Sequence, residues 1–306
     1  MMTNSHDFRY RGVLPILPTP FHDDDRIDFD SLGRLLDFLA LAGVDGVTVL
    51  GVLGEGSALT DDEAREVVRF ACDSGSGLPV VVGASRPSPY ATRAITEFAA
   101  EAGAAAVMVA PPSVEGISES AVWAFFAEAA SESLPLIVQD HPASTRVQMP
   151  AALLVRMIEE LPVVAGLKCE AVPAGPKIRA IRERTQRVPV LTGLGALYAA
   201  TDLAAGAEGF NTGFAFPEVL LALLGAARAG DAARVLELYR RFLPLIVFEQ
   251  HPGPAIRKDV WRRRGILGSP RVRPPAQQLD PWMAGQLALL LQDAFPGADL
   301  AVPVEV

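Results

Sequence analysis

Short, continuously apolar runs alternate with longer amphipathic stretches along most of the chain. The eight runs are rich in Val, Ile, Leu and Ala, and they lie at residues 13–17, 46–50, 79–82, 106–110, 136–139, 164–168, 188–192 and 207–211. Runs of this length without polar alternation are typical of strands buried on both faces, as in a parallel sheet covered by helices. Between the runs the apolar residues follow a helical period; the leucines at 32, 35, 36 and 39, for example, share one face.

Local signals mark where several of these helices begin and end. Thr60 and Glu63 have the spacing of a capping box, in which each side chain accepts from the other residue's backbone amide. Ser88 and Pro89 are residue types that favour the N-cap and the first helical position. The glycines expected to end helices just before the next strand are Gly43, Gly103 and Gly206.

Eight successive strand–helix units without a long linker predict an α/β fold, a closed (β/α)8 TIM barrel rather than a doubly wound open sheet. We expect the barrel to occupy residues 1–229 and to carry the active site. Residues 230–306 read as helices only, at 232–248, 255–264 and 281–295, with a Pro- and Arg-rich loop at 268–278. This part is predicted to be a C-terminal helical extension packed on the barrel.

Charge and cysteine content exclude several classes of function. The chain has 27 basic and 36 acidic residues, a net charge of −9, and its basic residues form no aromatic-rich stripe. We therefore expect no nucleic-acid partner and no membrane partner, and take a small molecule as the substrate. Cys72 and Cys169 lie far apart and predict neither a disulfide framework nor a multi-cysteine metal site. Residues 1–7 are polar and predict no secretory signal, and no apolar run is long enough to span a membrane, so a cytoplasmic protein is expected.

The candidate chemistry lies where polar residues follow the apolar runs, because active sites of such barrels form at the carboxyl ends of the strands. Lys168 is the most informative of these residues. Only three of the 27 basic residues are lysines, and one of them ends a buried strand. Burial lowers the pKa of an amine, and a neutral amine can condense with a ketone. The sequence thus supports two interpretations equally: a Schiff-base lysine, or a strand-end lysine that reaches solvent or pairs with Glu170.

Strand five ends in three polar residues. Gln139 and His141 are two apart and can share one side of the strand, with Asp140 on the opposite side. His141 is a candidate general acid or base, or else a structural histidine bonded to a nearby carbonyl. The four histidines have no spacing typical of metal ligands, so no metal site is predicted.

Other strand ends supply candidate substrate-binding groups. The backbone amides of Val52, Leu53, Gly54 and Glu55 could hold a carboxylate, with Ser57 close by, although Glu55 could instead cap or pair within its loop. Gly193 follows Thr192 in a Thr-Gly-Leu-Gly segment that could hold an anion or form only a tight turn. Thr192 and Asn211 are expected to meet substrate hydroxyls.

Taken together, these motifs resemble those of the dihydrodipicolinate synthase and N-acetylneuraminate lyase superfamily of Schiff-base aldolases. The matching segments are Leu-Pro-Thr-Pro-Phe at 17–21, Gly-x-x-Gly-Glu at 51–55, Leu-Thr at 59–60 and Gly-Leu-Lys at 166–168. The resemblance covers nearly the whole chain. It implies a barrel with C-terminal helices, Lys168 as the imine-forming residue, pyruvate or another 2-oxo acid as the carbonyl partner, and a homo-oligomer, either a dimer or a tetramer.

The chain also departs from the superfamily's pattern. Gln139 stands where members usually carry the tyrosine that shuttles protons, and Val52 and Leu53 replace two threonines of the synthase. The region 111–113 matches a further tyrosine, and Ser144 replaces the arginine that would bind a dicarboxylic semialdehyde. The resemblance therefore implies neither an authentic dihydrodipicolinate synthase nor a sialic acid lyase.

The sequence leads to two functional hypotheses. The first is a metal-independent class I lyase, either a carbon–carbon aldolase or a carbon–oxygen hydro-lyase, that acts on a pyruvate-like 2-oxo acid. The covalent imine on Lys168 is its electron sink, no separate cofactor is needed, and His141 or Asp140 replaces the tyrosine. The alternative is a catalytically impaired barrel that binds a 2-oxo acid or a related metabolite as a sensor.

Overall fold

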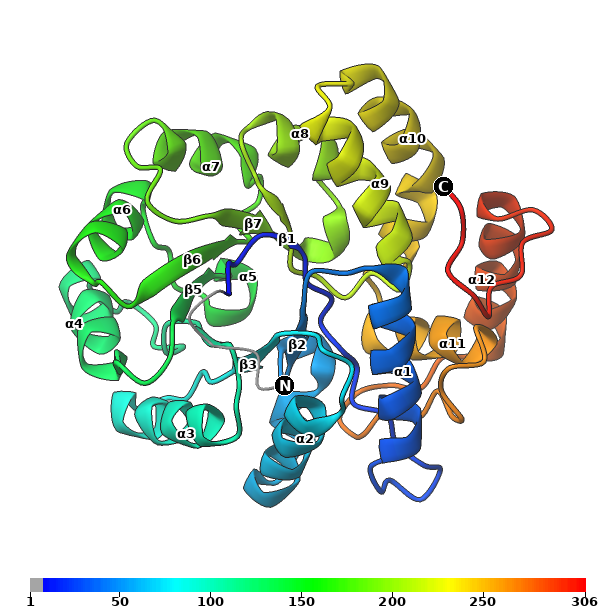
Figure 1. The fold of residues 1–306 in the computed structure, drawn as a ribbon, viewed down its shortest axis with the longest axis horizontal. Coiled ribbons are helices and arrows are strands. Elements are labelled where there is room, and N and C mark those ends of the chain that lie inside the picture. Colours follow the sequence, from blue (N-terminus) through cyan, green and yellow to red (C-terminus); the bar gives the residue numbers. More distant parts are fainter. Residues whose placement is uncertain (1–7) are drawn as a thin grey trace.

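Eight parallel strands follow one another around a barrel, and helices surround them (Figure 1). The computed structural model describes residues 8–306; residues 1–7, and with them the prediction of no secretory signal, lie outside the described part. The strands are β1 (Gly12–Val13), β2 (Val47–Val49), β3 (Val80–Gly83), β4 (Ala106–Val109), β5 (Leu136–Asp140), β6 (Val164–Cys169), β7 (Val190–Thr192) and β8 (Gly209–Phe210).

The sheet runs in the order β1-β8-β7-β6-β5-β4-β3-β2, and each strand pairs with its neighbour in parallel. Beyond the end of β1, a parallel bridge pairs Ile16 with Thr48 of β2, and the Leu17 amide donates to the Thr48 carbonyl at 2.9 Å. These contacts join the first strand to the second and close the ring. The predicted (β/α)8 barrel is confirmed.

Helices cover the outside of the barrel, where the apolar stripes seen in the sequence pack on the strands. They are α1 (Phe29–Ala42), α2 (Asp61–Asp73), α3 (Pro89–Glu101), α4 (Glu119–Ala129), the single turn α5 (Pro142–Thr145), α6 (Ala151–Glu160), α7 (Gly175–Arg182), α8 (Ala199–Ala204) and α9 (Pro217–Arg228). Short 3-10 turns follow β2 at Val52–Gly54 and Gly56–Ala58, and one follows β7 at Leu194–Ala196.

The predicted helix signals are largely present. Thr60 and Glu63 form the capping box of α2, and Gly43 ends α1 in the left-handed conformation with φ +79°. Pro89 occupies the first turn of α3, but the Ser88 hydroxyl makes no capping hydrogen bond. The expected Ser88 cap is therefore wrong in its contact, although the helix begins where the sequence places it.

Three helices follow the barrel: α10 (Ala232–Phe248), α11 (Pro254–Arg263) and α12 (Pro281–Ala294). They lie along one side of the barrel, beside α9 and α1 (Figure 1). Arg264, at the end of α11, is fully buried, pairs with Glu218 of α9 at 2.5 Å, and packs over the rings of Phe38, Phe216 and Trp261. Its charge is thus shielded inside the junction between these helices and the barrel. Within residues 8–306, no helix is both long and apolar enough to cross a membrane.

A small second core fills the inside of the barrel. Tyr10 and Leu14 pack there against side chains that point inward from the strands: Val81, Ala106, Met108, Ile137 and Leu191. Gly166 of β6 makes room for Tyr10, since a Cβ atom at this position would lie 2.3 Å from Tyr10 Cδ1.

Candidate active site

The pairing of β5 with β6 decides which polar side chains share the barrel interior. The register aligns Gln139 with Lys168, and Asp140 with Cys169. Because alternate residues of a strand point to opposite faces, the first pair lies inside the barrel and the second lies toward the surrounding helices. The contacts of these side chains agree with this arrangement: Asp140 meets Lys177 of α7, and Cys169 is part of the outer core.

Lys168 is buried, with 1% of its surface exposed, and its Nζ lies 3.3 Å from Glu170 Oε2. Burial lowers the pKa of Lys168, while the charge and hydrogen bond of Glu170 oppose that change. The net result is an amine that loses its proton more readily than a lysine in water. Such an amine is suited to attack a carbonyl carbon.

Glu170 is the central acceptor of this site. Its Oε2 accepts from Gln139 Nε2 at 2.7 Å, its Oε1 accepts from the Leu194 amide at 3.3 Å, and His141 Nδ1 lies 3.9 Å from Oε2. Burial alone would raise the pKa of Glu170, but Lys168, His141 and the hydrogen bonds outweigh it and lower the pKa. The carboxylate is therefore ionised beside the amine. The sequence indicates Glu170 only as a partner of Lys168. Its position two residues after Lys168, at the carboxyl end of a predicted strand, is the available signal for a role in the site.

The backbone of Gly193 lies against the Glu170 carboxylate, and this close approach is possible because glycine has no side chain. A Cβ atom at Gly193 would lie 2.2 Å from Glu170 Oε1, so only glycine lets the carboxylate occupy its position. Gly193 had been predicted to bind substrate. The structure gives it a supporting contact with Glu170.

Asp140 and His141 differ in their relation to Lys168. The Asp140 carboxylate points away from the barrel interior and pairs with Lys177 Nζ at 2.6 Å, so the structure does not bring it to the amine. Burial raises the pKa of Asp140, and Lys177 opposes that rise. His141 stays near Glu170, and its Nδ1 shares a hydrogen bond of 2.8 Å with Ser144 Oγ.

Thr192 and Asn211 are engaged within the fold. Thr192 Oγ1 donates to Asp202 of α8 at 2.5 Å, because its neighbour Leu191 is the β7 residue that faces inward. Asn211 is fully buried, and its Nδ2 donates to the Leu14 carbonyl at 2.7 Å and to Thr48 Oγ1 at 2.8 Å. The Thr192 side chain thus points to a helix and not, as expected, to a substrate hydroxyl. The Asn211 side chain joins the segments that follow β1 and β8 to β2.

Glu55 connects the loop after β2 to the C-terminal part of the chain. Glu55 adopts a left-handed conformation with φ +54°, and its buried carboxylate pairs with Lys258 of α11 and accepts a hydrogen bond from the Arg273 amide at 3.0 Å. Burial lowers the pKa of Lys258 to about 8, with Glu55 opposing the change. The Glu55 side chain is thus paired, as one of the predicted alternatives has it, but its partners belong to the C-terminal part of the chain and not to its own loop.

The remaining residues of this loop face different surroundings. The amides of Gly54 and Glu55 close the turn by donating to the carbonyls of Gly51 at 2.9 Å and Val52 at 3.2 Å. Of the four predicted amides, those of Val52 and Leu53 therefore remain candidates for binding a substrate carboxylate. The Val52 side chain is 62% exposed, and Leu53 packs close to Gly213.

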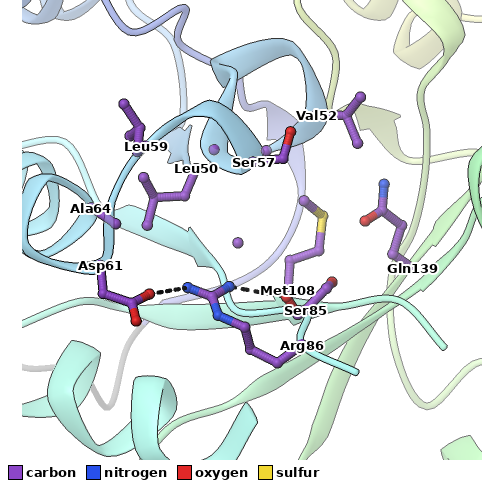
Figure 2. A pocket seen from close by; sticks show the side chains of 13 residues that line it. Leu50, Val52, Ser57, Leu59, Asp61, Ala64, Ser85, Arg86, Met108 and Gln139 are labelled. Carbon is purple, nitrogen blue, oxygen red and sulfur yellow. Dashed lines mark hydrogen bonds and ion pairs between the residues drawn. The ribbon is translucent and has the colours of Figure 1, made fainter. Parts of the chain in front are cut away.

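A pocket of about 400 Å³ lies between the loops that follow β2 and β3 and reaches Gln139 (Figure 2). Its wall consists of Leu50, Gly51, Val52, Gly56, Ser57, Leu59, Asp61, Ala64, Gly83, Ser85, Arg86, Met108 and Gln139. Sequence reasoning missed Arg86, because no motif marks the loop after strand three. Arg86 donates to the Ser85 carbonyl at 3.0 Å, and its other terminal nitrogen lies 4.0 Å from Asp61.

Within residues 8–306, no group of three or more His, Cys, Asp or Glu side chains is arranged to hold a metal ion. The groups gathered around Lys168 are instead a carboxylate, an amide and an imidazole. This set can hold an imine and move a proton at the neighbouring carbon atom.

Comparison with known proteins places this geometry in a wider group. Residues 9–294 match the model of the dihydrodipicolinate synthetase family. An L-2-keto-3-deoxyarabonate dehydratase from Azospirillum brasilense is 33% identical over 303 residues, which cover 96% of this chain and 98% of that protein. A putative 2-dehydro-3-deoxy-D-gluconate aldolase, YagE, from Escherichia coli K12 is 28% identical, covering 92% of this chain and 96% of that one.

A solved structure agrees with the sequence comparison. The crystal structure of dihydrodipicolinate synthase from Rhodopseudomonas palustris superimposes with a TM-score of 0.88 and 32% identity, over 92% of this chain and 97% of that chain. The likeness thus extends through the barrel and the C-terminal helices together.

Proposed function

Because the chain belongs to the dihydrodipicolinate synthetase family and is a lyase, we propose that it dehydrates a 2-oxo acid bearing a hydroxyl group at C4. The reaction proceeds through an imine between Lys168 and the C2 carbonyl. The observation that carries this proposal is the buried ion pair of Lys168 and Glu170, at 3.3 Å, inside the barrel.

The first step is formation of the imine. The ammonium of the resting ion pair first loses one proton to solvent, and the neutral Lys168 amine then attacks C2 of the substrate. The former carbonyl oxygen takes one proton from this nitrogen and one from solvent, and it leaves as water. Burial supports this step by lowering the pKa of the amine. The positively charged imine then acidifies the hydrogens at C3, because the electrons left after deprotonation are delocalised onto nitrogen.

Glu170 is the proposed acid and base. Its carboxylate takes the C3 proton, which leaves an enamine, and then gives that proton to the C4 hydroxyl as the C4–O bond breaks. One molecule of water is released, and hydrolysis of the unsaturated imine frees the product and restores Lys168. The hydrogen bonds of Glu170 from Gln139 and the Leu194 amide hold the carboxylate in a fixed orientation for both transfers.

Two observations favour dehydration over carbon–carbon cleavage. The relative from A. brasilense, at 33% identity, is named as a dehydratase of a 2-keto-3-deoxy acid. In addition, Gln139 stands at the position in strand five where members of the superfamily usually carry a tyrosine, and its side chain is hydrogen-bonded to Glu170. The Glu170 carboxylate is therefore the nearest acid–base group to the Lys168 amine. Aldol cleavage is the second candidate, supported by the 28% identity with YagE, which is named as an aldolase.

We further propose that the enzyme needs no separate cofactor, because the covalent imine on Lys168 serves as the electron sink. The pocket beside Gln139 is proposed to receive part of the substrate. The resemblance also favours a homo-oligomer, either a dimer or a tetramer. Sedimentation of the purified protein tests that assignment, and a monomer at micromolar concentration would contradict it.

The function is tested by incubating the protein with 2-keto-3-deoxyarabonate, with and without borohydride. We expect a mass increment on the peptide that contains Lys168, none in Lys168→Met, and a dehydrated 2-oxo product without borohydride. Release of pyruvate would instead identify an aldolase. Trapping without any turnover would support the alternative of a binding protein, and no adduct with this acid or with pyruvate would refute the imine.

A further inference from the structure

Tyr10 brings a phenol into the barrel interior, in the layer below Lys168. The side chain is 1% exposed and packs in the inner core with Leu14 and Ile137. Its ring lies against Gly166, where a Cβ atom would come within 2.3 Å. Gly166 is two residues before Lys168 on β6, so the ring lies one layer below Lys168 inside the barrel.

The Tyr10 hydroxyl has no hydrogen-bond partner among residues 8–306, and it is shielded from solvent. A buried polar group without a partner costs stability, and a phenylalanine would fill the same space without that cost. Burial raises the pKa of Tyr10 well above its usual value, and the charge of Glu170 adds to the effect. The phenol is therefore protonated throughout the physiological range and can act only as a hydrogen-bond donor toward an anion.

Formation of the imine changes the number of hydrogen-bond donors around the Glu170 carboxylate. In the free protein the carboxylate is 4% exposed and has the Lys168 ammonium at 3.3 Å. Once the lysine nitrogen is bonded to a substrate carbon, it keeps at most one N–H group, and that group must follow the substrate. Glu170 then remains buried with one donor fewer, and a buried carboxylate that loses a donor is destabilised.

We propose that Tyr10 is a positioning residue that donates a hydrogen bond to Glu170, directly or through one water molecule, while Lys168 is bound to the substrate. The unpaired hydroxyl of the free protein is thus a donor held for the covalent intermediate. This inference rests on the imine of the proposed function, but it does not depend on which bond breaks afterwards.

The experiment compares the wild-type protein with Tyr10→Phe, which removes one oxygen atom, and with Tyr239→Phe as the matched control. The Tyr239 hydroxyl donates to the Leu197 carbonyl at 2.5 Å, outside the site. Pyruvate is the probe for all three proteins: borohydride reports the imine, and deuterium exchange into the pyruvate methyl group at saturating pyruvate reports proton transfer as a function of pD. Thermal unfolding reports stability.

For Tyr10→Phe we expect an undiminished yield of trapped imine, a Tm equal to or above the wild-type value, and exchange slowed about ten- to hundredfold. The acid limb of the exchange profile should move up by about one pH unit, because Glu170 in the imine complex loses a donor to its charged form. Tyr239→Phe should lower Tm and leave the profile in place.

Other outcomes contradict the inference in distinguishable ways. If wild type forms the imine and Tyr10→Phe keeps its exchange rate and profile, Tyr10 has no part in the reaction. If Tyr10→Phe loses stability as Tyr239→Phe does, its hydroxyl has a structural partner in the free protein and the inference fails. If wild type itself traps no imine, the proposed function fails, and the covalent state invoked here does not exist.

Discussion

The amine of Lys168 has its nearest charged neighbour two residues further along the chain, directly after the end of β6. That neighbour, Glu170, lies 3.3 Å away, accepts from Gln139, and is kept in place by the bare backbone of Gly193. Each of these contacts acts on one carboxylate. At the scale of single residues, the candidate chemistry therefore depends on the position and protonation of Glu170.

We predict that Glu170→Gln lowers the dehydration rate by about 10²- to 10⁴-fold, the usual contribution of a general acid–base group. Imine trapping with pyruvate should persist, because Lys168 is intact. Glu170→Asp keeps the charge but shortens the side chain, and it should retain more activity than Glu170→Gln. Steady-state kinetics with borohydride trapping checks the prediction, and full activity of Glu170→Gln would remove Glu170 from the mechanism.

His141 should matter less than Glu170. Its Nδ1 is bonded to Ser144 at 2.8 Å and lies 3.9 Å from Glu170, so its main effect on the site is through the pKa of that carboxylate. We expect His141→Asn to lower kcat by less than about tenfold, and to shift the acid limb of the kcat profile upward, because the imidazole helps to keep Glu170 ionised. A loss equal to that of Glu170→Gln would give His141 the catalytic role predicted from the sequence.

At the scale of elements, the sequence could predict which segments are strands and which side of a strand each residue faces. The alternation at β5 correctly separates Gln139 from Asp140, because parity is a local property. It could not predict the partner of Glu55, since Lys258 belongs to a helix some two hundred residues later. The sequence also could not predict the lengths of the strands. An apolar run indicates which residues are buried, whereas a strand is defined by its hydrogen bonds, and at β8 these span only Gly209–Phe210.

The turn after β7 offers an element-scale test of the geometry. In Gly193→Ala the new Cβ atom would meet Glu170 Oε1 at 2.2 Å, so the carboxylate must leave its observed position beside Lys168. We expect at least about a hundredfold loss of turnover, since displacement of a catalytic group by an ångström can cost that much.

The matched control is Gly225→Ala in α9, where nothing lies within 4 Å of the new methyl group. It should raise the free energy of unfolding by about 0.5–1 kcal/mol, because alanine favours a helix interior over glycine, and should leave turnover unchanged. If Gly193→Ala were as active as Gly225→Ala, Glu170 would not need its observed position.

At the scale of the whole molecule, the part after residue 230 does more than cover the barrel. Arg273, in the loop before α12, binds both carboxylate oxygens of Glu63 at 2.6 and 2.8 Å, and Lys258 of α11 binds Glu55. The loop after β2 and the start of α2 are thus held by the chain's last seventy residues or so. Composition and helix pattern predicted these helices, but only the folded chain shows that they fix a wall of the pocket.

The Glu63–Arg273 contact gives a pH prediction. The hydrogen bond from Arg273, against a smaller effect of burial, lowers the pKa of Glu63 from 4.5 to about 2. A carboxyl group with a depressed pKa in the folded state adds stability above its unfolded pKa. That contribution is lost as the pH falls from 4.5 toward 2.

We therefore expect Glu63→Gln to be less stable than wild type at pH 6, with the difference shrinking toward pH 3. Urea unfolding at both values measures it. Glu66→Gln removes a carboxylate from an exposed position of the same helix and serves as the control. A wild-type advantage that is equal at both pH values would contradict the linkage.

The chain's three lysines are all enclosed: Lys168 and Lys258 are buried, Lys177 is largely covered, and each faces a carboxylate. The positive charges of the solvent-facing surface in residues 8–306 are therefore carried by arginine, which acylating reagents and amine-directed cross-linkers leave unmodified. Such reagents, unlike a 2-oxo acid, should label the native protein poorly on its ε-amines. A covalent label found on Lys168 of the folded protein thus reports entry into the barrel rather than chance reaction at the surface.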